Sequence, residues 1–445
     1  MRISKTFLIV FSLLLPITPA HAIEVPASFN FQGTGYGHGV GLSQIGARGK
    51  ALGGESAASI LSYYYSGTQL LSLTDNQNIR VNIGHLLTQA TLKSGTQNST
   101  LNLYVGDVGE DLSAIPVATL SSKSGISFIQ LGRNISAFVV TGKNSQFIGT
   151  NAAWSVRWSG TRYLEGIPST VSLKVNSKSV KYRYGQIQVK SVKAPLLGQR
   201  MAVTNTVRIH DEYLYGIGEV PSSWPPAALE AQVIAARTYA LGKIGRIRSE
   251  CDCNIYSTTV DQNFVGYSKE DEKVNRIDYG ILWKEAVNRT FIDSESALVI
   301  TQGGLPINAF YFSSSGGKTQ NIKDVWGSEF AYLLGVPDPW SLDPKINPRY
   351  YMWTRSVPQA MMAQAFSLPD VIAFTIDSLS QTNSVLAISG YSSEGKRVSL
   401  TGEVFRSRTK LPSTWLKNNL QEIVYPVFVP ECKPNPVYEG VFCNA

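Results

Sequence analysis

The fold of this chain is decided by one stretch, SSWPPAALEAQVIAARTYALGK (residues 222–243), which predicts a buried helix. Its serines are residues that cap helices, and the two prolines that follow suit a first helical turn. Beyond them, apolar residues recur three or four positions apart, and further alanines widen the apolar surface until it nearly encircles the helix. We therefore expect a central, mostly buried helix over residues 227–243.

Two polar side chains, Gln232 and Arg237, interrupt this apolar helix. Burying a guanidinium group without partners costs on the order of several kcal/mol. The sequence therefore predicts that Arg237 meets a carboxylate or backbone carbonyls inside the protein.

A single carboxylate, Glu219, lies just ahead of the helix in the segment YLYGIGEVP (residues 213–221). The helix N-terminus would favour its ionised form, whereas desolvation by Tyr215 and Trp224 would favour its protonated form. Glu219 is accordingly a candidate general acid. The alternative is a structural carboxylate that caps the helix or pairs with Arg237.

The rest of the chain has the composition of a folded, sheet-rich protein. Of its 445 residues, 43% are hydrophobic and only 16% are charged, which excludes a disordered chain and a coiled coil. Alternating apolar and polar residues predict strands at 101–105, 127–131, 137–141, 171–175, 186–192, 371–376, 385–389 and 398–401, a hairpin at 297–312 and a second helix at 358–366. The predicted fold class is α+β, with a β-rich core around the central buried helix and a β-rich accessory region.

These patterns divide the chain into five parts. They are a signal peptide (1–22), a Gly-His-Gly segment with its helix (23–75), a β-rich accessory region (76–195), the core around the buried helix (196–430) and a cysteine-containing tail (431–445). The length suits two or three compact units.

The first 22 residues predict export. Arg2 and Lys5 precede a largely apolar run from Phe7 to Leu15 and the small-x-small cleavage pattern at residues 20–22, as in a secretory signal peptide. Removing the two cations from the formal charge of +8 leaves +6 on the mature chain. A mildly basic exported protein suits an anionic partner such as cell wall or a membrane surface, and the alternative is ordinary surface charge.

All four cysteines, Cys251, Cys253, Cys432 and Cys443, follow the signal peptide, and an oxidising compartment makes disulfides the default. A bridge between Cys432 and Cys443 would tether the polar tail, and we expect that pairing. A bridge from Cys251 to Cys253 across one residue is strained, and no histidine lies near to complete a zinc site. For this pair a disulfide, free thiols and cross-pairing with the tail stay open.

A glycine-rich segment, GTGYGHGVGLSQ (residues 33–44), has glycine at every second position up to Gly41. Without a Cβ, these glycines let a polymer or another strand lie against the backbone, where His38, Ser43 and Gln44 would hydrogen bond to it. The segment lacks the GxGxxG and Gly-Lys-Ser/Thr patterns, so nucleotide binding is not predicted. The alternative is a tight turn before a helix over residues 45–51.

A second polar segment, SSSGGKT (residues 313–319), follows the predicted hairpin. No G-x-S-x-G elbow surrounds its serines, and His38, His85 and His210 lie in no partner motif, which argues against a serine hydrolase. The sequence contains no H-E-x-x-H motif either, so a zinc hydrolase is not predicted.

Several segments together resemble the family of the stage II sporulation protein D and the LytB-type amidase enhancers. They are residues 213–225, 228–240, 309–319, 324–333 and 405–416. In that family the glycine-histidine-glycine segment usually comes last, whereas here it comes first, which predicts a circular permutation. Because domain termini often lie close together, permutation preserves packing, and we expect residues 31–70 to pack beside Glu219 and complete the same groove.

The resemblance implies a lytic transglycosylase that cleaves the glycan strands of peptidoglycan, with Glu219 as the catalytic residue and 1,6-anhydro sugar ends as products. It also implies that Gln232 and Arg237 shape the site. The other candidates for substrate binding are His38, Ser43, Gln44, Ser313, Ser314, Ser315, Lys318 and Thr319. Some members carry zinc near the segment of Cys251 and Cys253, but the lack of histidines here leads us to expect no metal and no cofactor.

The rival hypothesis is a non-catalytic wall-binding protein that stimulates a separate amidase, as the enhancers of the family are described. Glu219 discriminates the two hypotheses, because only the enzyme needs it. Under both, the expected partners are peptidoglycan strands, with no nucleic acid and no stable membrane insertion. The expected location is secreted or periplasmic, in association with the cell wall.

Overall fold

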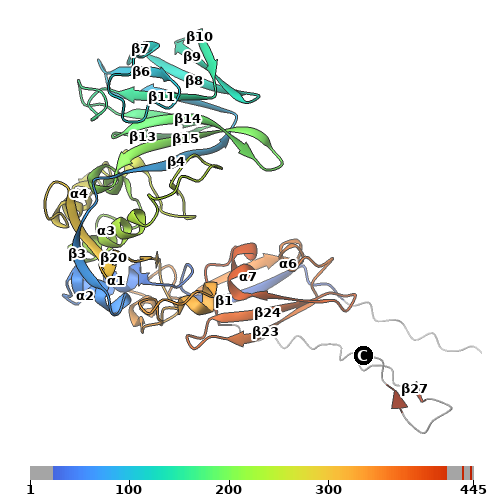
Figure 1. Ribbon diagram of the computed structural model, residues 1–445. Coiled ribbons are helices and arrows are strands. Elements are labelled where there is room, and N and C mark those ends of the chain that lie inside the picture. The colour runs from blue at the N-terminus through green and yellow to red at the C-terminus, as the bar shows by residue number, and fades with distance from the viewer. Residues whose placement is uncertain (1–23, 418–432, 435–440, 443–445) are drawn as a thin grey trace, which may run out of the picture.

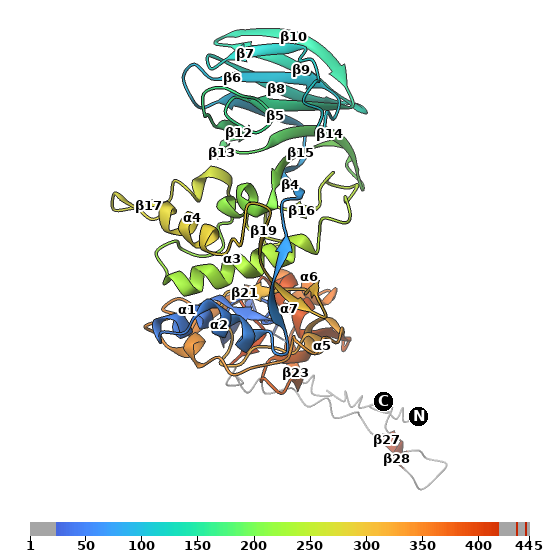
Figure 2. The same ribbon diagram turned by 60° about the vertical axis from the view of Figure 1, so that its left-hand side comes forward.

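The structure is a computed structural model that describes residues 24–417, 433–434 and 441–442. It contains 20% helix and 40% strand, so the predicted mixed α+β class with a sheet-rich character is confirmed. Figures 1 and 2 show stacked sheets at one end, helices around α3 in the middle and a smaller sheet-and-helix part at the other end. The predicted signal peptide lies outside the described residues. Within those residues, no helix combines the length and the apolar character needed to cross a membrane.

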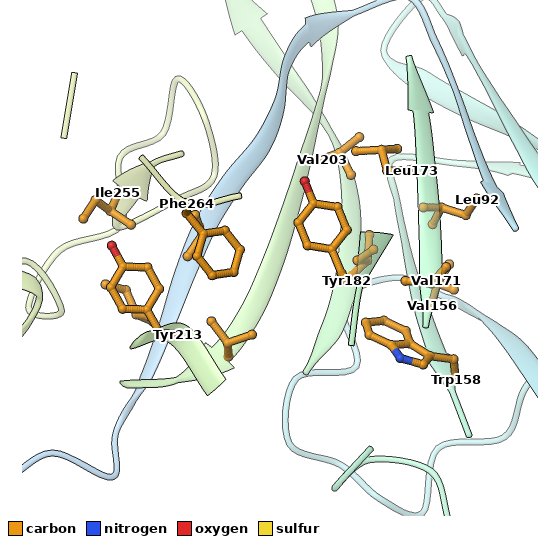
Figure 3. Close-up of a cluster of buried hydrophobic side chains, with 14 of the residues drawn as sticks. Leu92, Val156, Trp158, Val171, Leu173, Tyr182, Val203, Tyr213, Ile255 and Phe264 are labelled. Atoms are coloured by element: carbon orange, nitrogen blue, oxygen red, sulfur yellow. The ribbon is translucent and has the colours of Figure 1, made fainter. Parts of the chain in front are cut away.

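The accessory region forms two stacked sheets that share a core. The six-stranded sheet has the order β10 (Asn144–Asn151), β9 (Asn134–Thr141), β8 (Ser124–Leu131), β5 (Gln89–Ser94), β12 (Val171–Val175) and β13 (Lys178–Tyr182). The seven-stranded sheet has the order β16 (Ile255–Tyr256), β4 (Asn78–Leu87), β15 (Gly198–Arg208), β14 (Gln186–Ala194), β11 (Ala153–Trp158), β6 (Thr100–Val105) and β7 (Ala118–Ser121). The strands predicted between residues 101 and 192 all fall within these strands. Leu92 and Val171 from one sheet meet Val156 and Val203 from the other (Figure 3).

This core continues beyond the two sheets into the part that holds α3 (Pro226–Leu241). Figure 3 shows Tyr213, Ile255 and Phe264 on the other side of Tyr182 in one hydrophobic cluster. The ring of Phe264 stacks on Tyr213 with centroids 5.4 Å apart, and on Tyr182 at 6.2 Å. The accessory sheets are therefore packed firmly onto the α3 region by apolar contacts.

The helix α3 begins and ends close to the residues predicted for it. Pro226 occupies its first turn, but no side chain caps its start, because the Ser222 hydroxyl donates to Glu272 instead. Twelve of its sixteen residues are buried, including Gln232 and Arg237. It packs against α1 (Gln44–Leu52), α2 (Ala57–Tyr64) and α4 (Gly280–Arg289) (Figure 2).

The predicted hairpin at residues 297–312 is only partly correct. β19 (Ser296–Gln302) turns at Gly303-Gly304 into β20 (Leu305–Pro306), and its other edge pairs with β3 (Gln69–Thr74). Residues beyond β20 leave the hairpin, and β21 (Tyr311–Phe312) pairs in parallel with β2 (Leu42–Ser43). The glycine-rich segment, rather than β19, is the partner of this strand.

A close backbone approach explains why β21 has that partner. Gly41 has φ of +80°, and a Cβ placed there would lie 2.1 Å from the carbonyl oxygen of Phe310. At Gly37 a Cβ would lie 2.9 Å from Cβ of Phe312. The expected contact of another strand with the glycine-rich backbone is therefore made by the protein's own residues 310–312.

The last part of the structure brings together residues 28–34 and residues from 353 onward. β1 (Ser28–Thr34) lies between β22 (Trp353–Pro358) and β26 (Trp415–Leu416). A second sheet follows the order β23 (Ala373–Leu379), β24 (Val385–Tyr391) and β25 (Arg397–Thr401), with α6 (Gln359–Phe366) and α7 (Gly402–Thr409) beside it. The strands and the helix predicted here are confirmed, with shifts of a few residues at their ends.

The remaining elements are short. They are α5 (Ile322–Trp326), the hairpin of β17 (Lys273–Val274) and β18 (Ile277–Asp278), the pair β27 (Lys433–Pro434) and β28 (Val441–Phe442), and helical turns at Ile209–Tyr213, Leu214–Gly216, Gly266–Ser268 and Pro339–Leu342. The first two of these helical turns lead from β15 to Glu219.

Candidate active site

Glu219 is half-buried and accepts hydrogen bonds from three other segments of the chain, through Asn263, Tyr311 and Gln44. The backbone N–H of Asn263 donates to its Oε1 atom at 2.6 Å, and the hydroxyl of Tyr311 donates to the same atom at 3.1 Å. The loop that holds Asn263 is fixed here by the backbone bridge between Ile217 and Phe264. Both donors are neutral and both contact one oxygen of the carboxyl group.

Burial raises the pKa of Glu219 above its ordinary value, and the hydrogen bonds from Asn263, Tyr311 and Gln44 oppose this effect by favouring the carboxylate. Among residues 24–417, Glu219 forms no salt bridge, although other glutamates of the chain do. Its carboxyl group is therefore able to hold a proton and to release it without breaking an ion pair.

Gln44 and Gln232, both predicted from the sequence, lie together beside Glu219. Gln44 is the first residue of α1 and Gln232 lies on α3, and the two buried side chains are joined by a hydrogen bond from Nε2 of Gln44 to Oε1 of Gln232 at 3.2 Å. Gln44 also hydrogen bonds to Glu219. The N-terminal segment thus reaches the carboxyl group through Gln44, while Nε2 of Gln232 has no protein partner.

His38 contacts the strand that carries Tyr311 rather than Glu219 itself. Its Nδ1 accepts the backbone N–H of Val40 at 3.1 Å, and its ring also hydrogen bonds to the backbone of Tyr311. The rings of Phe310, Phe312 and Trp326 lie around it. Burial lowers the pKa of His38 to about 3, so the neutral imidazole supports the strand that carries Tyr311.

The predicted serine and threonine ligands are mostly turned into the protein. Ser43 caps α1 by accepting the backbone N–H of Gly46, and Ser315 donates to Asp338 at 2.7 Å. Thr319 accepts the N–H of Val336, and Ser314 is fully buried with no partner for its hydroxyl. In this conformation these four side chains cannot touch a bound strand, because their surroundings are filled by protein.

Ser313 and Lys318 are the two members of the second polar segment that keep partial exposure. The carbonyl of Ser313 accepts the N–H of Ile45, which ties this segment to α1. Of the polar candidates in residues 313–319, these two side chains are the ones available to solvent.

Arg237 meets a carboxylate and a carbonyl, as its burial predicts. Its Nε lies 2.7 Å from Oδ2 of Asp75, and its guanidinium donates to the carbonyl of Leu298 at 3.3 Å. Both charged side chains are fully buried, and His210 contacts the other oxygen of Asp75 at 2.6 Å. Burial lowers the pKa of Arg237 to about 10, although Asp75 opposes the effect. The alternative in which Arg237 pairs with Glu219 is wrong, since Asp75 takes that place.

Three residues of the site were not predicted from the sequence: Gln262, Asn263 and Tyr311. Gln262 is fully buried and donates to the Tyr311 hydroxyl at 2.8 Å, while Tyr213 donates to Gln262 at 2.6 Å. Gln262 and Asn263 lie in a loop without a periodic pattern, so nothing in the sequence marks them. Tyr311 lies within the segment that resembles the family, next to the serines that drew attention to it.

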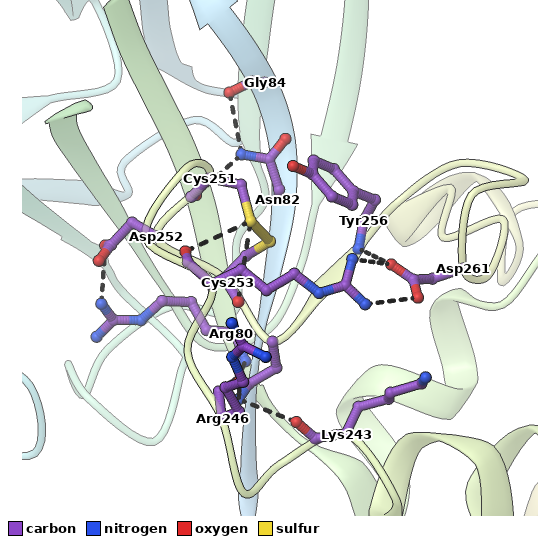
Figure 4. Close-up of a disulfide and its surroundings, with 12 residues drawn as sticks. Arg80, Asn82, Gly84, Lys243, Arg246, Cys251, Asp252, Cys253, Tyr256 and Asp261 are labelled. Atoms are coloured by element: carbon purple, nitrogen blue, oxygen red, sulfur yellow. Dashed lines mark hydrogen bonds and ion pairs between the residues drawn. A yellow bond between two sulfur atoms is a disulfide. The ribbon is translucent and has the colours of Figure 1, made fainter. Parts of the chain in front are cut away.

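The cysteine pair that stayed open in the sequence forms a disulfide. Cys251 and Cys253 are bridged and fully buried beside Asn82 of strand β4 (Figure 4). Asp252 between them pairs with Arg80 at 2.9 Å and with Lys190 at 2.8 Å. The ion pairs of Asp252, which lies between the bridged cysteines, therefore link the loop after α3 to the seven-stranded sheet.

The predicted bridge between Cys432 and Cys443 lies outside the described residues. Among the side chains that the structure describes, no group of three or more His, Cys, Asp or Glu residues is arranged to hold a metal ion.

Comparison with known proteins finds a family model that covers Glu219 and several relatives that match part of the chain. A family model described as stage II sporulation protein matches residues 198–292. The chain is 33% identical over 128 residues to the amidase enhancer of Bacillus subtilis (strain 168), which covers 29% of this chain and 15% of that protein. It is 31% identical over 156 residues to the stage II sporulation protein D of Bacillus amyloliquefaciens, which covers 34% and 43% of the two chains.

A third relative has a similar extent. The stage II sporulation protein D of Bacillus subtilis (strain 168) is 28% identical over 144 residues, which covers 32% of this chain and 40% of that protein. The matched part thus spans less than half the length of each of these relatives. No solved structure matches this chain.

These matches show that residues 198–292 are similar to the stage II sporulation protein family, in agreement with the SpoIID/LytB resemblance found in the sequence. The segment that the family model matches, residues 198–292, includes Glu219, Gln232 and Arg237. Gln44 and Tyr311 lie outside these matched residues and reach the site from other parts of the chain.

Proposed function

We propose that this protein is a peptidoglycan lytic transglycosylase in which Glu219 acts first as general acid and then as general base. The observation that carries the proposal is the environment of its carboxyl group. The group is half-buried, this burial raises its pKa, and its hydrogen-bond partners are all neutral. A carboxyl group with a raised pKa keeps its proton to a higher pH than an exposed one, and its neutral donors stabilise the carboxylate formed after transfer.

The reaction needs one carboxyl group and no water. Glu219 protonates the glycosidic oxygen, and the bond from this oxygen to the anomeric carbon of the muramyl sugar breaks. The C6 hydroxyl of the same sugar attacks that carbon and returns its proton to Glu219. The product has a 1,6-anhydro end, and the carboxyl group is restored. The N-acetyl group of the sugar assists at the anomeric carbon, so a second catalytic carboxylate is not required.

A circular permutation forms part of this proposal. Residues 31–70 pack on α3 through α1 and α2, and Gln44 contacts Glu219, as expected if the segment completes the same site from the other end of the chain. We propose that it supplies here what the C-terminal segment supplies in relatives with the usual order.

We also propose that the protein works outside the cytoplasm on cell-wall glycan. The support is the pattern of the first 22 residues, the net positive charge and the names of the relatives. A second candidate function, stimulation of a separate amidase, is favoured by one of the names: a relative 33% identical over the matched part is called an amidase enhancer.

Replacement of one carboxyl group tests the proposal. Glu219→Gln removes the transferable proton and keeps the shape, so we expect the release of anhydro ends from purified glycan strands to fall at least ~100-fold. Mass spectrometry of the products measures this. Glu230→Gln is the matched control, because Glu230 lies on α3 and pairs with Arg289.

Two other outcomes of this experiment would contradict the proposed function. A wild-type protein that binds sacculi, releases no anhydro ends and accelerates an added amidase would support the enhancer. A Glu219→Gln variant with full transglycosylase activity would show that another group transfers the proton.

A further inference from the structure

Glu219 ends a chain of hydrogen bonds that the reaction above does not yet use. The hydroxyl of Tyr213 donates to Oε1 of Gln262 at 2.6 Å, and Nε2 of Gln262 donates to the hydroxyl oxygen of Tyr311 at 2.8 Å. The Tyr311 hydroxyl then donates to Oε1 of Glu219 at 3.1 Å. Tyr213 and Gln262 are fully buried, so water does not compete for the bond between them.

One backbone carbonyl determines the direction of every bond in this chain. The oxygen of Ala236, which can only accept, lies 3.3 Å from Nε2 of Gln262. The amide of Gln262 must therefore present Nε2 to Ala236 and Tyr311, and Oε1 to Tyr213. Because the oxygen of Tyr311 already accepts from Gln262, the proton of Tyr311 is directed toward Glu219.

We propose that Gln262 and Tyr311 are positioning residues that keep the transferable proton of Glu219 on Oε2. Oε1 accepts from Tyr311 and from the backbone of Asn263, so a proton on that oxygen would face two donors, while Gln44 makes the weakest of the three hydrogen bonds to the carboxyl group. The protonated carboxyl group therefore carries its hydrogen on Oε2, and the two donors stabilise the carboxylate after transfer. The inference rests on the proposed function, which makes this proton the reactive one.

The charged and titratable groups around this chain of hydrogen bonds do not replace Tyr311 as the donor to Glu219. Asp261, which acts electrostatically on Tyr213 and Tyr239, is held by two 2.9 Å hydrogen bonds from Arg248 and by the Tyr239 hydroxyl. Burial is the main cause that raises the pKa of all three tyrosines, Tyr213, Tyr239 and Tyr311, and the charge of Glu219 adds to it. They stay protonated and able to donate. On the other side of β21, His38 is kept neutral by burial and by Arg406.

Titration of Glu219 in two variants tests the proposal directly. Tyr311→Phe removes a donor that favours the carboxylate, so the titration midpoint of Glu219 should move upward by about one pH unit. Gln262→Met leaves the Tyr311 hydroxyl in place but frees its orientation, so a smaller upward shift is expected. The measurement is ¹³C NMR of full-length protein with labelled glutamate carboxyl carbons, and the signal that disappears in Glu219→Gln identifies Glu219.

Tyr163→Phe is the matched control. Its hydroxyl donates to the carboxylate of Glu110 at 2.8 Å in the accessory sheets, so its removal should leave the Glu219 midpoint unchanged. In the enzyme, the alkaline limb of the pH–rate profile should move upward with the NMR midpoint in Tyr311→Phe.

Two results would overturn the inference. One is a folded Tyr311→Phe variant in which the titration midpoint of Glu219 is the same as in the wild type. The other is a Tyr163→Phe variant that shifts this midpoint as much as Tyr311→Phe does. If Tyr311→Phe does not fold, a wild-type midpoint in Gln262→Met overturns it equally. The NMR titration does not depend on catalytic activity, so it can fail while the proposed function holds. The proposed function fails separately, if Glu219→Gln keeps full transglycosylase activity.

Discussion

The fold buries Arg237 fully and Glu219 in part, and the partners of the two side chains give them different roles. Arg237 has a buried carboxylate within ion-pair distance, so its charge is fixed and its contribution is structural. Glu219 has only neutral donors, and burial shifts its pKa toward the range where a proton is exchanged. The sequence predicted the kind of partner that Arg237 needs. It did not identify Asp75, because the pair depends on how β19, the strand that pairs with β3, packs on α3.

The buried ion pair gives a prediction for single residues. Asp75→Asn leaves the Arg237 guanidinium without a carboxylate, and we expect the free energy of unfolding to fall by about 3–5 kcal/mol. Urea denaturation measures the loss. The double variant Asp75→Asn with Arg237→Met removes both charges and should recover a large part of it. A loss below about 1 kcal/mol in the single variant would contradict the prediction.

Among the elements, those with a long hydrophobic period were predicted well and the short ones were not. α3 and the strands of the accessory sheets carry their pattern over many residues, and each lies close to its expected position. β2 and β21 have two residues each, too few for any period, and their parallel pairing joins segments far apart in the chain. The glycine-rich segment predicted a close approach but not its partner.

The close approach gives a prediction for this element. Gly41→Ala introduces a Cβ at positive φ, 2.1 Å from the Phe310 carbonyl oxygen, and should separate β2 from β21. Gly54→Ala is the matched control, since its φ is +87° with no atom within 4 Å of the added Cβ. We expect the control to lose about 1–2 kcal/mol of unfolding free energy from the backbone conformation alone, and Gly41→Ala to lose at least twice as much. Equal losses in urea denaturation would contradict the packing explanation.

On the scale of the whole molecule, three hydrophobic clusters divide the protein differently from the five parts predicted along the chain. The largest cluster runs without a break from the accessory sheets into the α3 region, while a separate one lies between the sheets and helices of the last part. Residues 28–74 contribute to the last part and to the α3 region alike. The site therefore depends on packing between segments from both ends of the chain.

The shared core gives a prediction for the whole molecule. Leu103→Ala in the accessory sheets and Leu229→Ala in α3 both remove fully buried side chains of the largest cluster, so each should lower the same unfolding transition by about 2–5 kcal/mol. Ile388→Ala in the separate cluster should lower a different transition. Calorimetry of the three variants measures this. Two different transitions for Leu103→Ala and Leu229→Ala would show that the accessory sheets unfold independently.

By itself the sequence determined the resemblance to a family, the α+β class, the long helix with its buried arginine, and a lone carboxylate ahead of that helix. These properties are local, because periodicity, helix signals and motifs are read within a few turns of chain. Tertiary structure alone decided what surrounds the carboxylate: Asn263 is 44 residues away in the chain and Tyr311 is 92. It also decided that most of the serine candidates are buried. Contacts over such separations are set by the packing of whole elements, and burial and hydrogen bonding at those contacts determine where a proton resides.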